Sequence, residues 1–110
     1  MYHAVLTNTL VAAAALSANR FVTVTGAVPS ANGNVIGVTR APAGASGDLV
    51  PVDMLGIAEV EASAAISVGA AIATTNDGRA VTHSSGAVVA RALTAAGAAG
   101  QLIEVQLIPN

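Results

Sequence analysis

The sequence contains no cysteine, no tryptophan and no lysine, and it has one tyrosine and one phenylalanine among 110 residues. Without cysteine there is no disulfide, no thiol nucleophile and no cysteine-bound zinc. Without lysine there is no Walker-type phosphate contact and no lysine Schiff base. Only 9% of the residues are charged, against roughly 25% in an average soluble domain. The chain therefore lacks many of the residue types on which enzymes depend.

The few charges also restrict the partners that we expect. The net charge is -2, and all four basic residues are arginines scattered along the chain, so no basic patch for nucleic acid is expected. The apolar centre of Met1–Asn19 has no Lys or Arg before it, unlike a signal peptide. The same stretch is too rich in polar residues for a membrane span, since it contains Thr7, Asn8, Thr9 and Ser17. We expect neither nucleic acid nor a membrane as a partner.

What the sequence does contain is small apolar side chains. The hydrophobic fraction is 54%, mostly alanine and valine, and the length suits one domain. High hydrophobicity with low net charge is the opposite of the pattern of disordered chains. So few charges cannot cover the whole surface of a monomer, and we expect an apolar or neutral patch of the kind that marks interfaces. The composition thus predicts a folded module that is oligomeric or docked on a larger assembly.

The chain repeats itself. Val35–Leu55 aligns without a gap on Val88–Ile108, with seven identities in 21 positions. The matches include glycines and leucines, which are less easily matched by chance than alanines in this chain. Upstream, Ala12–Val24 resembles Ala62–Thr74. Two similar units therefore follow each other in the sequence.

We predict a single β domain over residues 11–110 that is built from these units, at about 12–55 and 62–108. Residues 1–10 lie outside the sequence repeat and contain the only tyrosine. Chain termini are ordered only when something holds them, so this segment is predicted to be an extended N-terminal arm. Its candidate interface residues are Tyr2, His3, Val5 and Leu6.

The local patterns favour strands. Arg20–Gly26 and Leu49–Met54 both alternate side chains with a period of two, which is typical of a strand. Ala43–Asp48 and Ala96–Gly100 are small-residue phrases with two glycines each, which predict hairpin loops with positive φ. Frequent turns with short strands are typical of a small sandwich or barrel. We therefore predict a mainly β fold, a compact barrel or sandwich made from a duplicated hairpin.

A helical interpretation competes for two alanine-rich stretches. Leu10–Ala18 and Ala62–Ala65 are rich in the best helix former. Neither stretch has the charged outer face that a surface helix normally shows. The prediction leaves room for a short helix in one or both of these stretches.

One cluster has the residue types of a hydrolase. Asp77, His83 and Ser84 or Ser85 would supply an acid, a base and a nucleophile. No nucleophile-elbow glycine pattern surrounds either serine, and Asp77 with His83 alone cannot complete a metal site. We interpret the segment as two polar turns around a short strand, with no catalytic residue and no metal.

Glu59 and Glu61 are two residues apart, so on a strand both would point to one face, as paired carboxylates do in a glycosidase. The simpler interpretation makes them the solvated face of a strand that carries Ala58, Val60 and Ala62 inward, because buried acids are rare unless paired. We predict no enzyme activity and no cofactor.

The repeated phrases resemble a known family. Over about 90 residues the chain is similar to the capsid cement or decoration proteins of tailed bacteriophages, which are small, cysteine-poor β proteins. The phrases that carry the likeness are Ile36–Val38, Ala43–Gly47, Leu49–Gly56, Ala65–Gly69, Asp77–Ala80 and Leu102–Leu107. One departure is Ala90, which stands where Gly37 stands in the first unit.

This resemblance implies a fold of the β-tulip or β-clip type and a structural role. It implies a virion protein, made in the host cytoplasm, that binds the outer surface of the expanded head. There it would cement neighbouring subunits of the major capsid protein, typically as a homotrimer, without catalytic residues. The alternative is a non-catalytic β module for carbohydrate or protein binding. Carbohydrate sites usually use exposed aromatic platforms, for which Tyr2 and Phe21 are the only candidates.

Overall fold

The computed structural model describes residues 3–110, with side chains described from Val5 onward. The chain forms eight strands: β1 (His3–Val11), β2 (Phe21–Val22), β3 (Gly37–Thr39), β4 (Leu49–Glu61), β5 (Ala71–Thr74), β6 (Ala80–Thr82), β7 (Ala90–Ala92) and β8 (Leu102–Leu107). The mainly β prediction is confirmed. The described residues contain no helix, so the short helix considered for the alanine-rich stretches is not formed. Accordingly, residues 3–110 include no helix that could cross a membrane.

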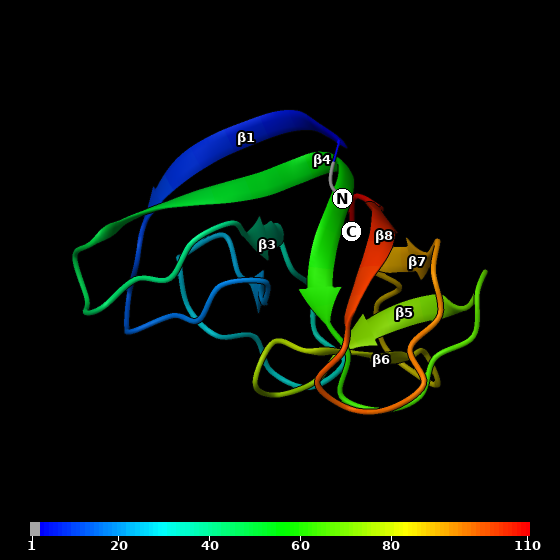
Figure 1. Cartoon of the computed structure of the whole chain (residues 1–110). Coiled ribbons are helices and arrows are strands. Elements are labelled where there is room, and N and C mark those ends of the chain that lie inside the picture. Colours follow the sequence, from blue (N-terminus) through cyan, green and yellow to red (C-terminus); the bar gives the residue numbers. More distant parts are fainter. Residues whose placement is uncertain (1–2) are drawn as a thin grey trace.

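The strands form one sheet in the order β2-β3-β4-β8-β7-β5-β6, and β1 pairs with β4 outside this path (Figure 1). The two ends of the sheet approach each other. Phe21 N donates to the carbonyl oxygen of Gly78 at 2.7 Å, just before β6, and Ala62, just after β4, forms a bridge with Ala80 of β6. The sheet is thus nearly closed into a small barrel, as predicted.

The interior contains two clusters of small side chains. The larger one is built around Phe21, Ile72 and Ile103 and includes residues from both halves of the chain. The smaller one contains Val50 and Val52 of β4, and it lies under β1. Alanine and valine supply most of both clusters, which is how a chain with almost no aromatic residues fills a β core.

The two halves have the same strand pairing. β2, β3 and β4 pair in one half as β5, β7 and β8 pair in the other, all antiparallel. In the hairpins, each pair of the first half recurs 53 residues later in the second: Val38 with Asp53 as Arg91 with Gln106, and Thr39 with Val52 as Ala92 with Val105. The duplication predicted from the sequence is therefore visible in the register of the strands.

The correspondence continues into β1. Thr7–Val11 pairs with the first part of β4 in the register in which Ile57–Glu61 pairs with β8. The structural repeat thus begins at Thr7, five residues before the repeat detected in the sequence. One difference separates the two copies: Ile57–Glu61 is the continuation of β4, whereas β1 is an independent strand near the chain start. That residues 1–10 act as an arm stays a prediction.

Two local expectations had different outcomes. The strand expected over Arg20–Gly26 ends at Val22, because Thr23 closes a tight turn: its hydroxyl accepts from Ala27 N at 3.2 Å. The glycine loops are confirmed, since Gly47 and Gly100 have φ values of 93° and 90°, in the region that other residues avoid.

Candidate functional site

By its described side chains β1 is the most exposed strand, and it carries three of the predicted interface residues, His3, Val5 and Leu6. With the first part of β4 it forms a two-stranded ribbon that arches across the top of Figure 1. Val5 is 79% exposed and Leu6 is 46% exposed. Tyr2 lies outside the described residues, and His3 is placed at the start of β1 by its backbone alone.

Two irregularities bend this ribbon. Between the pairs Ala4–Gly56 and Leu6–Leu55, β1 has one extra residue. Between Leu6–Leu55 and Thr7–Asp53, β4 has one extra residue. They cancel, so the strands pair in the same alignment on either side. Bulges of this kind bend a strand and redirect side chains. Leu6 lies between the two bulges, where its side chain reaches a groove.

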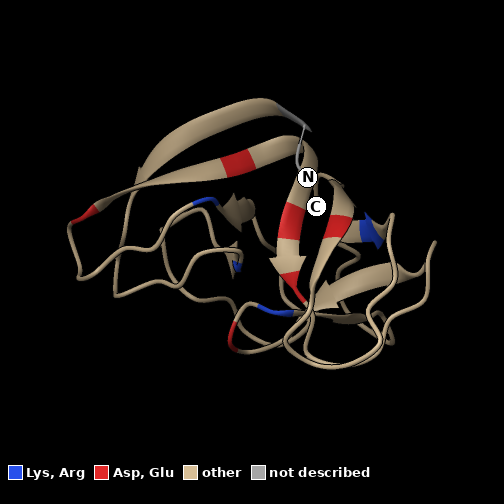
Figure 2. Ribbon diagram, in the orientation of Figure 1, with Lys and Arg blue, Asp and Glu red and all other residues tan. Residues whose placement is uncertain are grey.

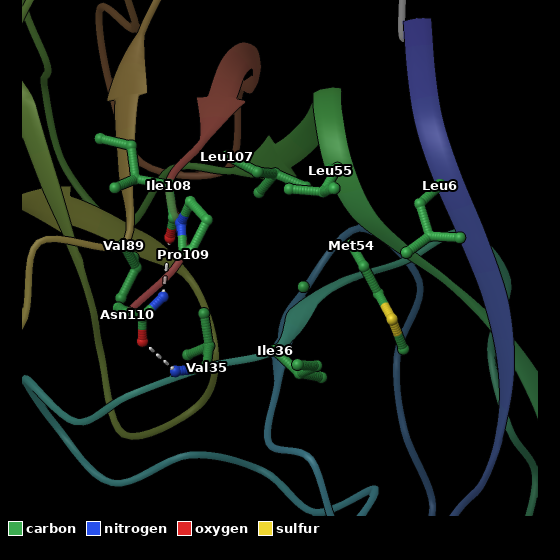
Figure 3. Close-up of a pocket in the computed structure, with 11 residues that line it drawn as sticks. Leu6, Val35, Ile36, Met54, Leu55, Val89, Leu107, Ile108, Pro109 and Asn110 are labelled. Atoms are coloured by element: carbon green, nitrogen blue, oxygen red, sulfur yellow. Dashed lines mark hydrogen bonds between the residues drawn. The ribbon is translucent and has the colours of Figure 1, made fainter.

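The groove has a volume of about 230 Å³ and is mainly apolar. Figure 3 shows Leu6, Met54 and Leu55 on one side of it and the end of the chain on the other. One end is closed by Asn110, whose Oδ1 accepts a hydrogen bond from Val35 N at 2.9 Å. The remaining lining residues are Ile36, Gly37, Val89, Leu107, Ile108 and Pro109.

Sequence reasoning identified Leu6 and missed the rest of the groove. The lining residues come from five separate segments, which the pairing of β1 with β4, of β3 with β4 and of β7 with β8 brings together. The only signal in the sequence was the surplus of apolar residues over charges, which predicts an apolar patch without placing it.

Among the described residues β1 pairs with β4 alone, so no strand lies along its outer edge. Two bonds show that the backbone groups of Thr9 point away from β4. Thr9 N donates to Asn8 Oδ1 at 2.9 Å, and the carbonyl oxygen of Pro51, opposite Thr9, accepts from Arg40 N on the other side of β4. Backbone groups alternate in an antiparallel pair, so those of Thr7, Thr9 and Val11 point away from β4. β1 has no proline, Lys, Arg, Asp or Glu, the residues that usually protect an edge (Figure 2).

An ionic cluster around the buried Asp53 fastens β1 to the barrel. Asp53 of β4 is 3% exposed. Its Oδ1 accepts from Thr7 Oγ1 of β1 at 2.7 Å and lies 2.8 Å from Arg40 Nη2, while its Oδ2 accepts from Arg40 Nε at 3.3 Å. Both carboxylate oxygens are thus engaged, which is the condition under which a buried charge is tolerated.

The residues considered for catalysis are used in turns. Asp77 accepts hydrogen bonds from Thr75 Oγ1 and from Arg79 Nε, the latter at 2.9 Å. The bond from Thr75, assisted by the charge of Arg79, lowers the pKa of Asp77 below its usual value. His83 Nε2 lies 3.0 Å from the carbonyl oxygen of Gly86. No group of three or more His, Cys, Asp and Glu that could hold a metal occurs in the part of the chain that the structure describes.

The paired glutamates also have a structural place. Ala58, Val60 and Ala62 are fully buried, and Glu59 and Glu61 lie on the opposite face of the strand, as predicted. Glu61 bridges two arginines: its Oε1 lies 3.3 Å from Arg20 Nη2 and its Oε2 lies 3.6 Å from Arg79 Nη1. These ion pairs join the two halves of the barrel at its surface.

The structure weakens the case for a carbohydrate site. Phe21 is 1% exposed in the larger core cluster, so it offers no platform for a sugar ring. The surface formed by the described residues therefore has no exposed aromatic side chain. Its distinctive features are the open edge of β1 and the adjoining apolar groove.

Comparison with known proteins agrees with the resemblance found in the sequence. Residues 2–107 match the family model described as phage cement protein. The fold is similar to the crystal structure of the N base of head fiber gp8.5 in bacteriophage phi29, with a TM-score of 0.77 and 26% sequence identity over 94% of this chain and 93% of that chain. None of the curated proteins compared matches the sequence. The chain belongs to the phage cement protein family and is a structural protein of the phage capsid.

Proposed function

We propose that this protein binds the outer surface of the mature phage head and holds neighbouring subunits of the major capsid protein together. It is made in the host cytoplasm, joins the virion as a homo-oligomer and catalyses no reaction. The observation that supports this most directly is the family match over nearly the whole chain. The similarity to a phage head fiber base adds support, since that protein also belongs to a phage head.

The proposed mechanism is stabilisation by selective binding. A protein that binds only the expanded shell lowers the free energy of that state by RT ln(1 + [L]/Kd) for each site. Selectivity follows if the contact spans two capsid subunits whose surfaces come into register only at maturation. Many copies, each contributing a few kcal/mol, then oppose the outward pressure of packaged DNA.

The open edge of β1 is the contact surface that we propose. An extended capsid segment adds to β1 as a further strand, so that main-chain hydrogen bonds supply affinity and side-chain contacts supply specificity. Val5 and Leu6 give this edge exposed apolar side chains, and Tyr2 and His3 precede them within the first three residues. The absence of charge on β1 favours the strand for burial in an interface, because no ion has to be desolvated.

A second apolar surface supports self-association. Val11 and Leu49 lie directly opposite each other at the far end of the ribbon, and they are 59% and 70% exposed. Exposed pairs of this size, in a chain with so few charges, favour contact between copies. The trimeric state is carried over from the resemblance, and sedimentation equilibrium measures it directly.

The test blocks the β1 edge without disturbing the β1–β4 pairing. Thr9→Pro removes an N–H that points away from β4 and places a ring on the open edge, where proline is tolerated in a sheet. Thr9→Ala keeps the N–H and serves as the matched control. Binding of each variant to purified expanded capsids that lack the protein is measured by co-sedimentation.

We expect Thr9→Pro to weaken capsid binding by roughly tenfold or more, and Thr9→Ala to change it by less than about threefold. Circular dichroism should show that both variants keep the β spectrum of the wild type. If Thr9→Pro binds expanded capsids as well as Thr9→Ala does, the β1 edge is not the contact. If the wild type does not bind such capsids at all, the proposed function is wrong.

A further inference from the structure

β1 and Ile57–Glu61 occupy equivalent positions in the two halves, but Ile57–Glu61 is part of the long strand β4. Ile57–Glu61 is kept beside β8 because it is the end of β4. β1, in contrast, is a separate strand that pairs with β4 alone among the described residues, and of Val5–Val11 only Leu10 is even partly buried. A strand with so little buried apolar surface is drawn from the least stable part of a fold. Backbone bonds of the buried Ala12 with Gly47 and Asp48 align the inner end of the strand, so its outer part depends on a further contact.

The cluster at Asp53 meets that need. Thr7 and Asp53 are directly opposite each other, so the 2.7 Å bond between them forms in one register only. Arg40, which follows β3, holds the same carboxylate from the other side at 2.8 Å and 3.3 Å. The cluster therefore joins β1, β4 and the end of β3 at one point.

The second half has no such cluster. The residues equivalent to Thr7, Asp53 and Arg40 are Ile57, Gln106 and Leu93, given the common registers of the two halves. None of the three carries a charge, and Gln106 is exposed where Asp53 is buried. The ionic cluster is present only in the half whose outer strand is a separate strand and not the continuation of β4.

We propose that Asp53 sets the register of β1 and thereby acts as a positioning residue that presents the binding edge in one alignment. With Thr7 and Arg40 in place, Leu6 is directed to the groove and Val5 to the surface. Because side chains alternate along a strand, a slip of one residue would exchange the faces of every side chain on β1. Fixing a register is the best-attested use of a buried polar cluster.

This inference rests on the proposed function only for what β1 binds; the alignment itself is tested on the isolated protein. Thr7→Val removes the hydroxyl and keeps a β-branched side chain of similar shape. Thr7→Ser restores the hydroxyl, and Thr9→Val is the matched control, since Thr9 lies on the same face of β1, opposite Pro51. Amide hydrogen exchange is measured by NMR for all four proteins.

In Thr7→Val, we expect the amides of Asn8 and Leu10 to exchange roughly tenfold faster, because they face β4 and a hydrogen bond to a buried charge is lost. The amides of Val60 and Val105 in the barrel should keep their rates. Thr7→Ser and Thr9→Val should exchange like the wild type. Cross-strand NOEs in Thr7→Val should include contacts from a shifted register.

Two results would overturn the inference. One is equal exchange in Thr7→Val and Thr9→Val, which would mean that the bond to Asp53 does not hold the strand. The other is equal acceleration in β1 and in the barrel, which would indicate a general loss of stability. Neither result bears on capsid binding, so the capsid assay with Thr9→Pro decides the proposed function separately.

Discussion

The two halves of this barrel share their strand registers but differ in the side chains and side-chain contacts at equivalent positions. The first half holds its outer strand with a buried ionic cluster at Asp53, and the second half holds it by chain continuity. The backbone pairing is thus reproduced without reproducing the side-chain contacts. The pairing common to both halves follows from local geometry and the inward face of each strand, whereas the outward face diverges and, at Asp53, adds a contact that only the first half has.

A glycine at the start of β3 shows the same contrast. A Cβ on Gly37 would overlap the carbonyl oxygen of Asp53, whereas the equivalent residue in the second half is Ala90 and is fully buried. The reason lies in the bulge of β4. β7 and β8 pair as far as Ala90 with Leu107, but β3 and β4 are paired only up to Asp53, next to the bulge.

The largest effect is therefore expected from exchanging these two residues. Gly37→Ala should lower the free energy of unfolding by about 2–3 kcal/mol, because the new methyl group must displace backbone rather than a flexible side chain. Ala90→Gly should cost only about 1 kcal/mol, from added backbone freedom in the unfolded state and a lost methyl contact. Urea denaturation of both variants measures the difference. Equal costs would mean that the bulge does not separate the two hairpins.

The elements that sequence analysis predicted are those that depend on local signals. The turn glycines and the alternating valines identified the duplicated hairpins and the inward faces. β1 was not recognised as a repeat because Thr7–Val11 and Ile57–Glu61 have no identical residue in common. Their equivalence exists only in the pairing with β4 and β8.

The candidate site was predicted in part, for a related reason. Val5 and Leu6 were recognised because they lie together at the start of the chain. Asp53 was not recognised as part of the site, because an acid at an outward position of a strand is normally solvated. It is buried by Thr7 and Arg40, which are 46 and 13 residues away in the sequence. Burial by distant partners leaves no local pattern.

The two glycine loops differ in the side chain that accepts hydrogen bonds from their backbone, and smaller effects are expected there. In the first loop Asp48 Oδ2 accepts from the backbone N of Gly44 and Ala45, at 3.0 and 3.1 Å. In the second, the equivalent Gln101 accepts from Gly97 N through Oε1 at 2.6 Å. A charged acceptor with two donors should contribute more than a neutral acceptor with one.

We expect Asp48→Ala to lower the free energy of unfolding by about 1–2 kcal/mol and Gln101→Ala by about 0.5–1 kcal/mol. Asp48→Gln, which makes the first loop resemble the second, should fall between the wild type and Asp48→Ala. Urea denaturation of the three variants gives the order. If Gln101→Ala were the more costly substitution, acceptor charge would not be what distinguishes the loops.

The smallest expected effect concerns two tight turns that differ by one acid. Thr23 and Thr75 each open a turn in which the hydroxyl oxygen accepts from the backbone N four residues later, at 3.2 and 3.0 Å. The hydroxyl of Thr23 then lies 3.0 Å from that of Thr25, while the hydroxyl of Thr75 donates to Asp77. Only the second turn can therefore respond to pH.

Asp77→Thr makes the second turn like the first and should remove this response. The hydrogen bond from Thr75, together with Arg79, lowers the pKa of Asp77 in the folded protein below its ordinary value of 3.8, so the unfolded chain binds the proton more readily. The stabilisation from Asp77 is thus complete above about pH 4 and is lost as the pH falls through the folded pKa. The difference in unfolding free energy between wild type and Asp77→Thr should shrink between pH 7 and about pH 3. Thr25→Val, at the equivalent position, should have the same effect at both pH values, and a difference for Asp77→Thr that did not change with pH would contradict the assignment.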